Sequence, residues 1–178
     1  MLTEFQRKKI AYHFEIIDFD NDGFLTREDL YNHGAAYADL IKVPQEDCVK
    51  KKLEWWNKMN ECLGIYKERP ITKAEHLQSF EMVMCNSNFL PVFLWDYMEL
   101  IWSYLNLEKN DYLPFKNFAG VMVSDRGDEA KEIFSLLDQE KRGKLSIQEL
   151  YGYWLSFFYS NNPDCPSKWV FGKFNLKT

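Results

Sequence analysis

One short acidic run near the amino terminus constrains the fold of this chain more than any other feature. Residues 18–29 read DFDNDGFLTRED, with carboxylates at positions 1, 3 and 5 and a glycine at position 6. A chain that curls round a small sphere points alternate side chains inward, so Asp18, Asp20 and Asp22 are expected to converge on one point. Three carboxylates this close repel one another unless a cation lies between them. The run therefore predicts a cation-binding loop between two helices.

The remaining ligands follow from the same twelve-residue pattern. Gly23 supplies the positive φ that turns the chain and lets the Phe24 carbonyl oxygen face the ion. Thr26 at position 9 is expected to coordinate directly or through a water molecule. Position 12 holds Asp29 instead of the longer glutamate that reaches an ion with both oxygens. A shorter acid lowers the number of ligands towards six, so the sequence predicts a Ca²⁺ site at which Mg²⁺ competes.

Helical patterns fill most of the remaining chain, while strand signals are nearly absent, so the predicted fold class is all-α. Capping boxes are expected where Thr3 precedes Gln6 and where Thr72 precedes Glu75. The second helix is expected to end near Gly34, because glycine suits a left-handed helix end. The expected helices cover residues 3–17, 27–33, 44–63, 72–85, 92–106, 114–123, 128–137 and 147–160.

Taken in pairs, these helices form a degenerate repeat of four helix-loop-helix hands. An apolar residue marks position 8 of each loop, namely Leu25, Ile71, Leu113 and Leu145, so the loops begin at residues 18, 64, 106 and 138. A cluster of Asn, Ser and Pro over residues 86–91 predicts a hinge. We therefore expect one pair of hands in residues 1–85 and a second pair, followed by a tail, in residues 91–178.

The other three loops are predicted to be degenerate. In the fourth loop, residues 138–149, Asp138, Gly143 and Glu149 are in register, but Arg142 takes position 5. A guanidinium cannot ligate a cation and repels it. Weak cation binding at the fourth loop, with Glu140 partly compensating for Arg142, stays open as an alternative. The loop at residue 106 lacks charge and the loop at residue 64 has almost no ligands, so both serve a structural purpose, because a hand needs a partner to cover its apolar face.

With these motifs in view, the chain resembles the sarcoplasmic calcium-binding proteins of the EF-hand superfamily, and within them the calexcitin-like branch. The resemblance covers nearly the whole length and rests on the opening LTEFQRKKI, the loop IDFDNDGFLTREDL, and the closing WLSFFYSNNPDCPSKWVFGKF. It implies a compact body of paired hands round an aromatic core, with a C-terminal tail folded onto it. The chain is also similar to coelenterate photoproteins and luciferin-binding proteins, whose aromatic-lined cavities hold a luciferin.

Composition narrows the classes of function. The net charge of −5 and the mixing of acids with bases argue against binding to nucleic acid, which needs clustered Lys and Arg. No apolar run reaches the roughly 20 residues that a membrane span requires. The four cysteines are widely spaced and follow no secretory leader, so we expect a cytoplasmic protein with reduced thiols. No set of residues for nucleophilic attack is recognisable, so we do not expect an enzyme. We expect the protein to be a monomer.

Three functions remain in competition. The first is a cytosolic calcium-binding protein, either a Ca²⁺/Mg²⁺ buffer or a sensor that presents an apolar surface to a target protein. The second is a carrier of a luciferin-type or other apolar ligand in a calcium-controlled cavity. The 14 Phe, 10 Tyr and 6 Trp provide enough aromatic side chains to line such a cavity. The third is a structural adaptor that works without an ion.

Overall fold

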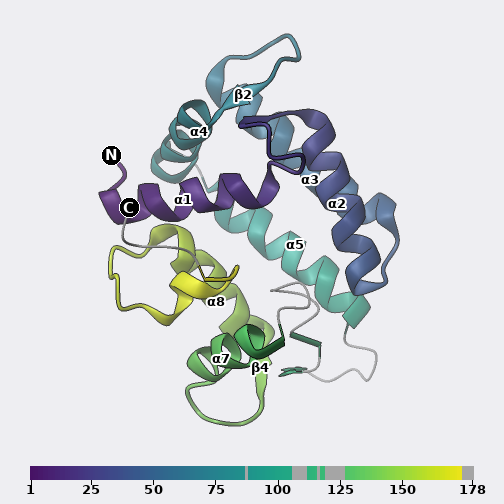
Figure 1. Ribbon diagram of the computed structural model, residues 1–178, viewed down its shortest axis with the longest axis vertical. Coiled ribbons are helices and arrows are strands. Elements are labelled where there is room, and N and C mark those ends of the chain that lie inside the picture. Colours follow the sequence, from purple (N-terminus) through teal and green to yellow (C-terminus); the bar gives the residue numbers. More distant parts are fainter. Residues whose placement is uncertain (87, 106–111, 116, 119–126, 174–178) are drawn as a thin grey trace. The chain divides into compact units, whose positions relative to one another are not determined.

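The computed structural model describes residues 1–86, 88–105, 112–115, 117–118 and 127–173 (Figure 1). In this part of the chain, helices dominate and the strands form only two short ladders, as the sequence predicts. The elements are α1 (Glu4–Ile17), β1 (Phe24–Leu25), α2 (Arg27–Ile41), α3 (Gln45–Leu63), β2 (Ile71–Thr72), α4 (Lys73–Asn86), α5 (Phe89–Leu105), β3 (Tyr112–Pro114), α7 (Gly127–Leu137), β4 (Lys144–Ser146), α8 (Ile147–Tyr159) and the 3-10 helix η1 (Pro166–Trp169).

The chain divides into two units, Met1–Leu90 and Pro91–Thr178. The boundary lies inside α5, after Leu90. It falls within residues 86–91, for which the sequence predicts a hinge. None of the described helices is both long and apolar enough to cross a membrane.

In the amino-terminal unit, two loops are joined by a two-residue antiparallel ladder. β1 pairs with β2 so that Leu25 lies opposite Ile71 and Phe24 lies opposite Thr72. Both Leu25 and Ile71 are fully buried. The two residues predicted at position 8 therefore meet across the ladder, and each hand covers the apolar side of the other.

Capping boxes fix the starts of the helices that flank these loops. Thr3 and Gln6 exchange side-chain and backbone hydrogen bonds at the start of α1. At the start of α4, the Glu75 N–H donates to the Thr72 hydroxyl at 3.3 Å, while the Glu75 carboxylate accepts from the Thr72 N–H at 2.9 Å. Both predicted boxes are confirmed.

The predicted end of the second helix is wrong. α2 continues through Gly34 to Ile41 and ends at Lys42, which has the left-handed conformation with φ of 58°. Gly34 is needed for close packing instead, because a Cβ atom there would lie 3.0 Å from the Val49 Cα of α3. Buried Ala38 continues the apolar face of α2 beyond Gly34. The burial of this face stabilises the longer helix by more than the roughly 1 kcal/mol that a glycine inside a helix costs.

The carboxyl-terminal unit repeats the ladder. β3 pairs with β4, placing Leu113 opposite Leu145, so the two position 8 residues of this unit also meet. The chain after α8 packs back onto this unit, where the Phe171 ring lies 4.9 Å from the Phe157 ring and 5.5 Å from the Trp154 ring. Most of the helix predicted for residues 114–123 falls outside the described residues.

All three histidines of the chain belong to the amino-terminal unit. His76 is fully buried and stacks on His13, with 5.5 Å between the ring centroids, and packs edge-on against Phe80. Burial lowers the pKa of His76 to about 3. Burial also lowers the pKa of His13 and His33, with the nearby Lys52 charge acting in the same direction. The neutral His76 imidazole is therefore part of the folded core, while His13 and His33 are half-buried.

Lowering the pH is expected to destabilise the amino-terminal unit. Below the ordinary histidine pKa of 6.5, the unfolded chain binds protons that the folded chain does not, so the free energy of unfolding falls as the pH falls towards the folded-state pKa. The slope is about 1.4 kcal/mol per pH unit for each such histidine. Urea unfolding without added metal, between about pH 7 and about pH 5, measures this slope. His76→Phe keeps an aromatic ring and removes one proton-binding group, so its slope should be smaller; equal slopes would contradict the assignment.

Candidate metal centre

Three carboxylates of the first loop, residues 18–29, lie together. Asp18, Asp20 and Asp22 each present one carboxylate oxygen, and these oxygens all lie within 4.8 Å of one another. In the described part of the chain, no other three His, Cys, Asp or Glu side chains come this close. The convergence expected from the alternating spacing is thus present in the structure.

The loop is shaped by hydrogen bonds from its own backbone to these carboxylates. The Gly23 N–H donates to Asp18 Oδ2 at 3.1 Å, the Asp22 N–H to Asp20 Oδ1 at 3.1 Å, and the Phe24 N–H to Asp22 Oδ1 at 2.8 Å. Since a carboxylate has two oxygens, each group can hold the backbone with one and present the other to a ligand. Gly23 has φ of 87°, the left-handed conformation predicted for it.

Asp18 is the buried member of the trio and supplies the test of whether a cation fits. Its side chain is 6% exposed, and Oδ1 is buried without a hydrogen-bond partner among the described residues. An unpaired carboxylate oxygen away from water is costly unless a positive group meets it. Asp20 and Asp22 are exposed. A divalent cation would satisfy Asp18 and relieve the repulsion, so the residues present fit Ca²⁺ or Mg²⁺.

The predicted backbone ligand lies at the edge of the ladder. Phe24 begins β1 and pairs with Thr72 of β2, so the ladder holds its backbone in place. Its side chain is 46% exposed. The next residue, Leu25, is fully buried in the core.

The structure gives the other two predicted ligands a structural function that sequence reasoning missed. Thr26 is the N-cap of α2 and forms a capping box with Asp29. Asp29 Oδ2 accepts from the Thr26 N–H at 2.7 Å and from the Thr26 hydroxyl at 2.5 Å, while Asp29 Oδ1 accepts from the Phe19 N–H at 3.2 Å. Both oxygens of this buried aspartate therefore already tie the two ends of the loop together.

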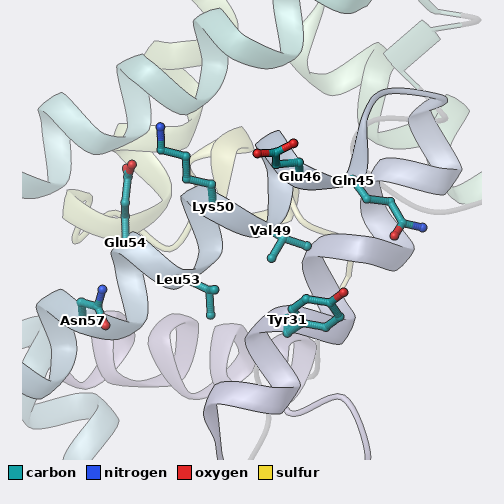
Figure 2. Close-up of a pocket in the computed structure, with 8 residues that line it drawn as sticks. All are labelled: Tyr31, Gln45, Glu46, Val49, Lys50, Leu53, Glu54 and Asn57. Carbon is teal, nitrogen blue, oxygen red and sulfur yellow. The ribbon is translucent and has the colours of Figure 1, made fainter.

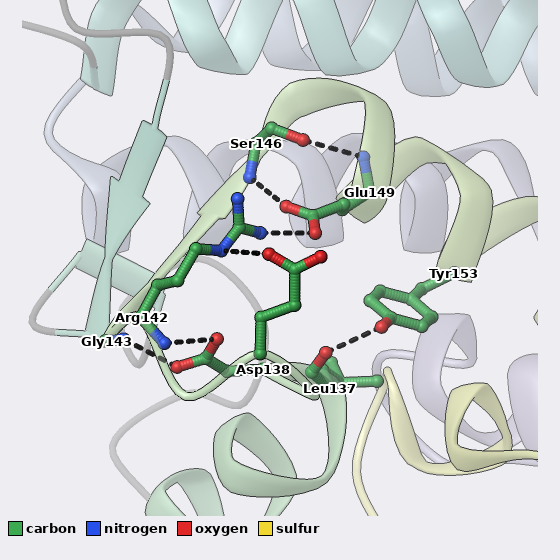
Figure 3. Close-up of polar contacts among 8 residues, drawn as sticks. Leu137, Asp138, Arg142, Gly143, Ser146, Glu149 and Tyr153 are labelled. Carbon is green, nitrogen blue, oxygen red and sulfur yellow. Dashed lines mark hydrogen bonds and ion pairs between the residues drawn. The ribbon is translucent and has the colours of Figure 1, made fainter.

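The degenerate loops balance their acids with basic side chains. In the second loop, Arg69 forms two hydrogen bonds with Glu75, at 2.6 and 3.2 Å, and these hold the pKa of Glu75 at about 2. The fourth loop keeps a folded shape, in which Asp138 accepts from the Gly143 N–H at 2.6 Å (Figure 3). Of the third loop, residues 106–111 and 116 lie outside the described residues.

A separate hollow lies between α2 and α3. Its volume is about 620 Å³, and Figure 2 shows Tyr31 of α2 beside Val49 and Leu53 of α3, with charged side chains along the edge. Sequence reasoning did not single out this hollow, because its walls come from two helices whose packing depends on Gly34. Its lining residues are Tyr31, Gln45, Glu46, Val49, Lys50, Leu53, Glu54 and Asn57.

Comparison with known proteins gives matches at the level of structure alone. No protein-family model matches the sequence, and no curated protein matches it. Okadaic acid binding protein 2.1 is 17% identical, with 97% of each chain covered and a TM-score of 0.79. Coelenterazine-binding protein from Renilla muelleri, in its calcium-loaded apo form, is 19% identical, with 97% of this chain and 100% of that chain covered and a TM-score of 0.64. A sarcoplasmic calcium-binding protein from amphioxus is 12% identical, with 98% and 100% covered and a TM-score of 0.69.

These likenesses show the fold. The chain has the all-α fold of the EF-hand calcium-binding proteins over nearly its whole length, which confirms the predicted fold class. The finer resemblance to the calexcitin-like branch stays a prediction.

Replacing Asp29 by Glu is expected to shift the preference of the first loop towards Ca²⁺ over Mg²⁺. The longer side chain can reach the ion with both oxygens, which suits the larger coordination number of Ca²⁺. The ratio of the two affinities should change by roughly tenfold, equivalent to about 1.4 kcal/mol. Competition titrations of Ca²⁺ against Mg²⁺ measure this ratio.

Glu28→Asp is the matched control, because it makes the reverse exchange at the exposed neighbouring position. Its ion preference should equal that of the wild type. An unchanged ratio in Asp29→Glu, or an equal shift in Glu28→Asp, would refute this account of position 12.

Proposed function

We propose that this chain is a cytosolic calcium-binding protein whose first loop binds one Ca²⁺ in competition with Mg²⁺. The proposal rests on the buried Oδ1 of Asp18, which has no hydrogen-bond partner among the described residues and belongs to the three carboxylates that converge. Asp18, Asp20 and Asp22 would hold the ion together with the Phe24 carbonyl oxygen. Thr26 and Asp29 would support it by closing the loop, or through a water molecule.

A binding function suits the rest of the chain better than catalysis. Three of the matching structures are named as binding proteins for calcium, okadaic acid and coelenterazine, and others are named as photoproteins, such as clytin. The four cysteines are free, which agrees with the reducing cytosol. We propose that the chain acts as a monomer, either as a Ca²⁺/Mg²⁺ buffer or as a sensor.

As a sensor, the chain would present the hollow between α2 and α3 to a target protein. α2 begins at the capping box that closes the ion-binding loop, and Tyr31, one turn into this helix, is 47% exposed at the hollow. An ion that orders the loop would therefore also fix the start of the helix that carries Tyr31.

Calorimetric titration is expected to show one Ca²⁺ bound per chain, with a lower apparent Ca²⁺ affinity when Mg²⁺ is present. Asp18→Asn should lower the Ca²⁺ affinity by roughly a hundredfold, as expected for losing about 3 kcal/mol of interaction with a charged group. Asp164→Asn makes the same change of charge at an exposed site far along the chain and should bind as the wild type does. A folded chain that responds to neither ion would overturn the proposal and favour an ion-independent adaptor.

The second candidate function is a carrier of an apolar ligand whose release calcium controls. Two buried histidine nitrogens favour it, because Nδ1 of His33 and Nδ1 of His76 have no hydrogen-bond partner among the described residues. Buried polar atoms in native proteins are usually paired, so a bound molecule with a polar group would satisfy them. The matching proteins named for okadaic acid and coelenterazine add support at the level of the fold.

Organic extraction of the natively purified protein, followed by mass spectrometry, tests the carrier function. A carrier should release an apolar compound in an amount close to one per chain, and His76→Phe should release less, because one polar partner is lost while the ring is kept. An empty extract from the wild type would count against the carrier function and leave the calcium-binding proposal intact.

A further inference from the structure

The fourth loop, residues 138–149, has the same backbone conformation as the first loop at equivalent positions. Positions 4 and 6 have positive φ in both loops, 55° and 72° at Lys141 and Gly143 against 58° and 87° at Asn21 and Gly23. In both loops the N–H of position 6 donates to the carboxylate of position 1, at 2.6 Å in the fourth loop and 3.1 Å in the first. The fourth loop is therefore folded as an ion-binding loop folds, although its sequence lacks the ligand at position 5.

The side chain at position 5 takes part in the closure of the fourth loop. The Arg142 Nε lies 3.2 Å from Glu140 Oε2, and an Arg142 Nη2 hydrogen donates to Glu149 Oε1. These two acids occupy positions 3 and 12, where an ion-binding loop has two of its ligands. Figure 3 shows the guanidinium of Arg142 turned towards the Glu149 carboxylate, with Asp138 below it at the base of the loop.

Position 1 shows the sharpest difference between the two loops. Both oxygens of Asp138 accept backbone hydrogen bonds, Oδ1 from the Arg142 N–H at 3.0 Å and Oδ2 from the Gly143 N–H at 2.6 Å. In the first loop, Oδ1 of Asp18 is buried and accepts no hydrogen bond from any residue that the structure describes. Burial is the same, since both aspartates are 6% exposed. The buried acid of the fourth loop therefore needs no outside charge.

The charge of the fourth loop is balanced within the loop itself. It contains three acids and three bases, Asp138, Glu140, Glu149, Lys141, Arg142 and Lys144, for a net charge of zero. The first loop contains five acids and one base, Asp18, Asp20, Asp22, Glu28, Asp29 and Arg27, for a net charge of −4. In the fourth loop, attraction to the three bases offsets the repulsion between carboxylates that favours a bound cation in the first loop.

The partner strand holds the basic side chains in place. The Arg142 guanidinium lies 5.5 Å from the ring centroid of Tyr112 on β3, and the Lys144 ammonium lies 4.0 Å from the same ring. Cations in these positions are attracted by the face of the ring. The ladder between β3 and β4 thus helps to orient the guanidinium over the loop.

We propose that Arg142 is an internal cation that takes over the task of a metal ion in the fourth loop. The guanidinium joins the acids of positions 3 and 12, so the hand keeps its folded shape at any Ca²⁺ concentration. Arginine keeps its charge at every physiological pH and cannot dissociate from the chain, so the cation is always available to close the loop. The fourth hand then contributes a fixed framework and takes no part in ion binding.

The experiment uses the full chain with Asp18→Asn and Asp20→Asn, which removes ligands of the first loop and makes the result independent of the function proposed above. This background chain should bind no Ca²⁺ at the fourth loop. Adding Arg142→Asp should raise the number of Ca²⁺ ions bound per chain by one, because acids then occupy positions 1, 3, 5 and 12. Adding Lys141→Asp instead, the same change of charge one position earlier, should raise it by none, because Arg142 is retained.

Hydrogen exchange read at residues 138–149 locates the effect. Arg142→Gln, which keeps most of the side-chain length and removes the charge, should exchange faster there than the wild type, and Arg142→Lys should lie between the two. Ca²⁺ should restore slow exchange to the Arg142→Asp chain and leave the wild type unchanged. Calcium-dependent protection of this loop in the wild type, an Arg142→Asp chain that folds but gains no ion, or unchanged exchange in Arg142→Gln would each overturn the proposal.

Discussion

The antiparallel ladder between paired loops is the constraint on which the rest of this structure depends. Leu25 and Ile71 are both fully buried where β1 meets β2, and Leu113 and Leu145 meet in the same way where β3 meets β4. A single helix pair exposes an apolar face, and the partner hand covers it. Each hand therefore needs its neighbour whether or not either loop binds an ion.

Because the ladders hold the paired hands together, the loops can differ in the charges of their side chains without loss of the fold. The first loop brings acids together and leaves Asp18 Oδ1 without a hydrogen-bond partner in the described part of the chain, whereas the second loop pairs Glu75 with Arg69. The fourth surrounds Arg142 with acids of its own chain. In each case negative charge is met by positive charge, and the loops differ in whether that charge is part of the chain or comes from solution. The sign and position of a few side chains thus decide which hand responds to an ion.

Features that depend on neighbours in the sequence could be predicted well. The capping boxes at Thr3 and Thr72 and the apolar residues at position 8 are local patterns, and the structure confirms them. Gly34 was misjudged because its function depends on α3, which approaches it from another part of the chain. The capping by Asp29 was missed because the spacing that marks a ligand at position 12 also places an acid three residues after the N-cap.

The first loop follows α1, the helix that carries Phe14 and His13, and both of these side chains contact His76 of α4, so α1 links the two candidate functions physically. Asp18 follows directly after α1, and its N–H donates to the Phe14 carbonyl at 2.9 Å. The Phe14 ring lies 5.5 Å from the ring of His76, which also stacks on His13 of the same helix. An ion that holds Asp18 would therefore also hold the end of α1. The turn of α1 just before this end contains His13 and Phe14, which contact His76. Since the fold is shared with proteins named for calcium, okadaic acid and coelenterazine, the fold does not choose between these functions. The shared helix provides a path by which binding at one place would alter the other.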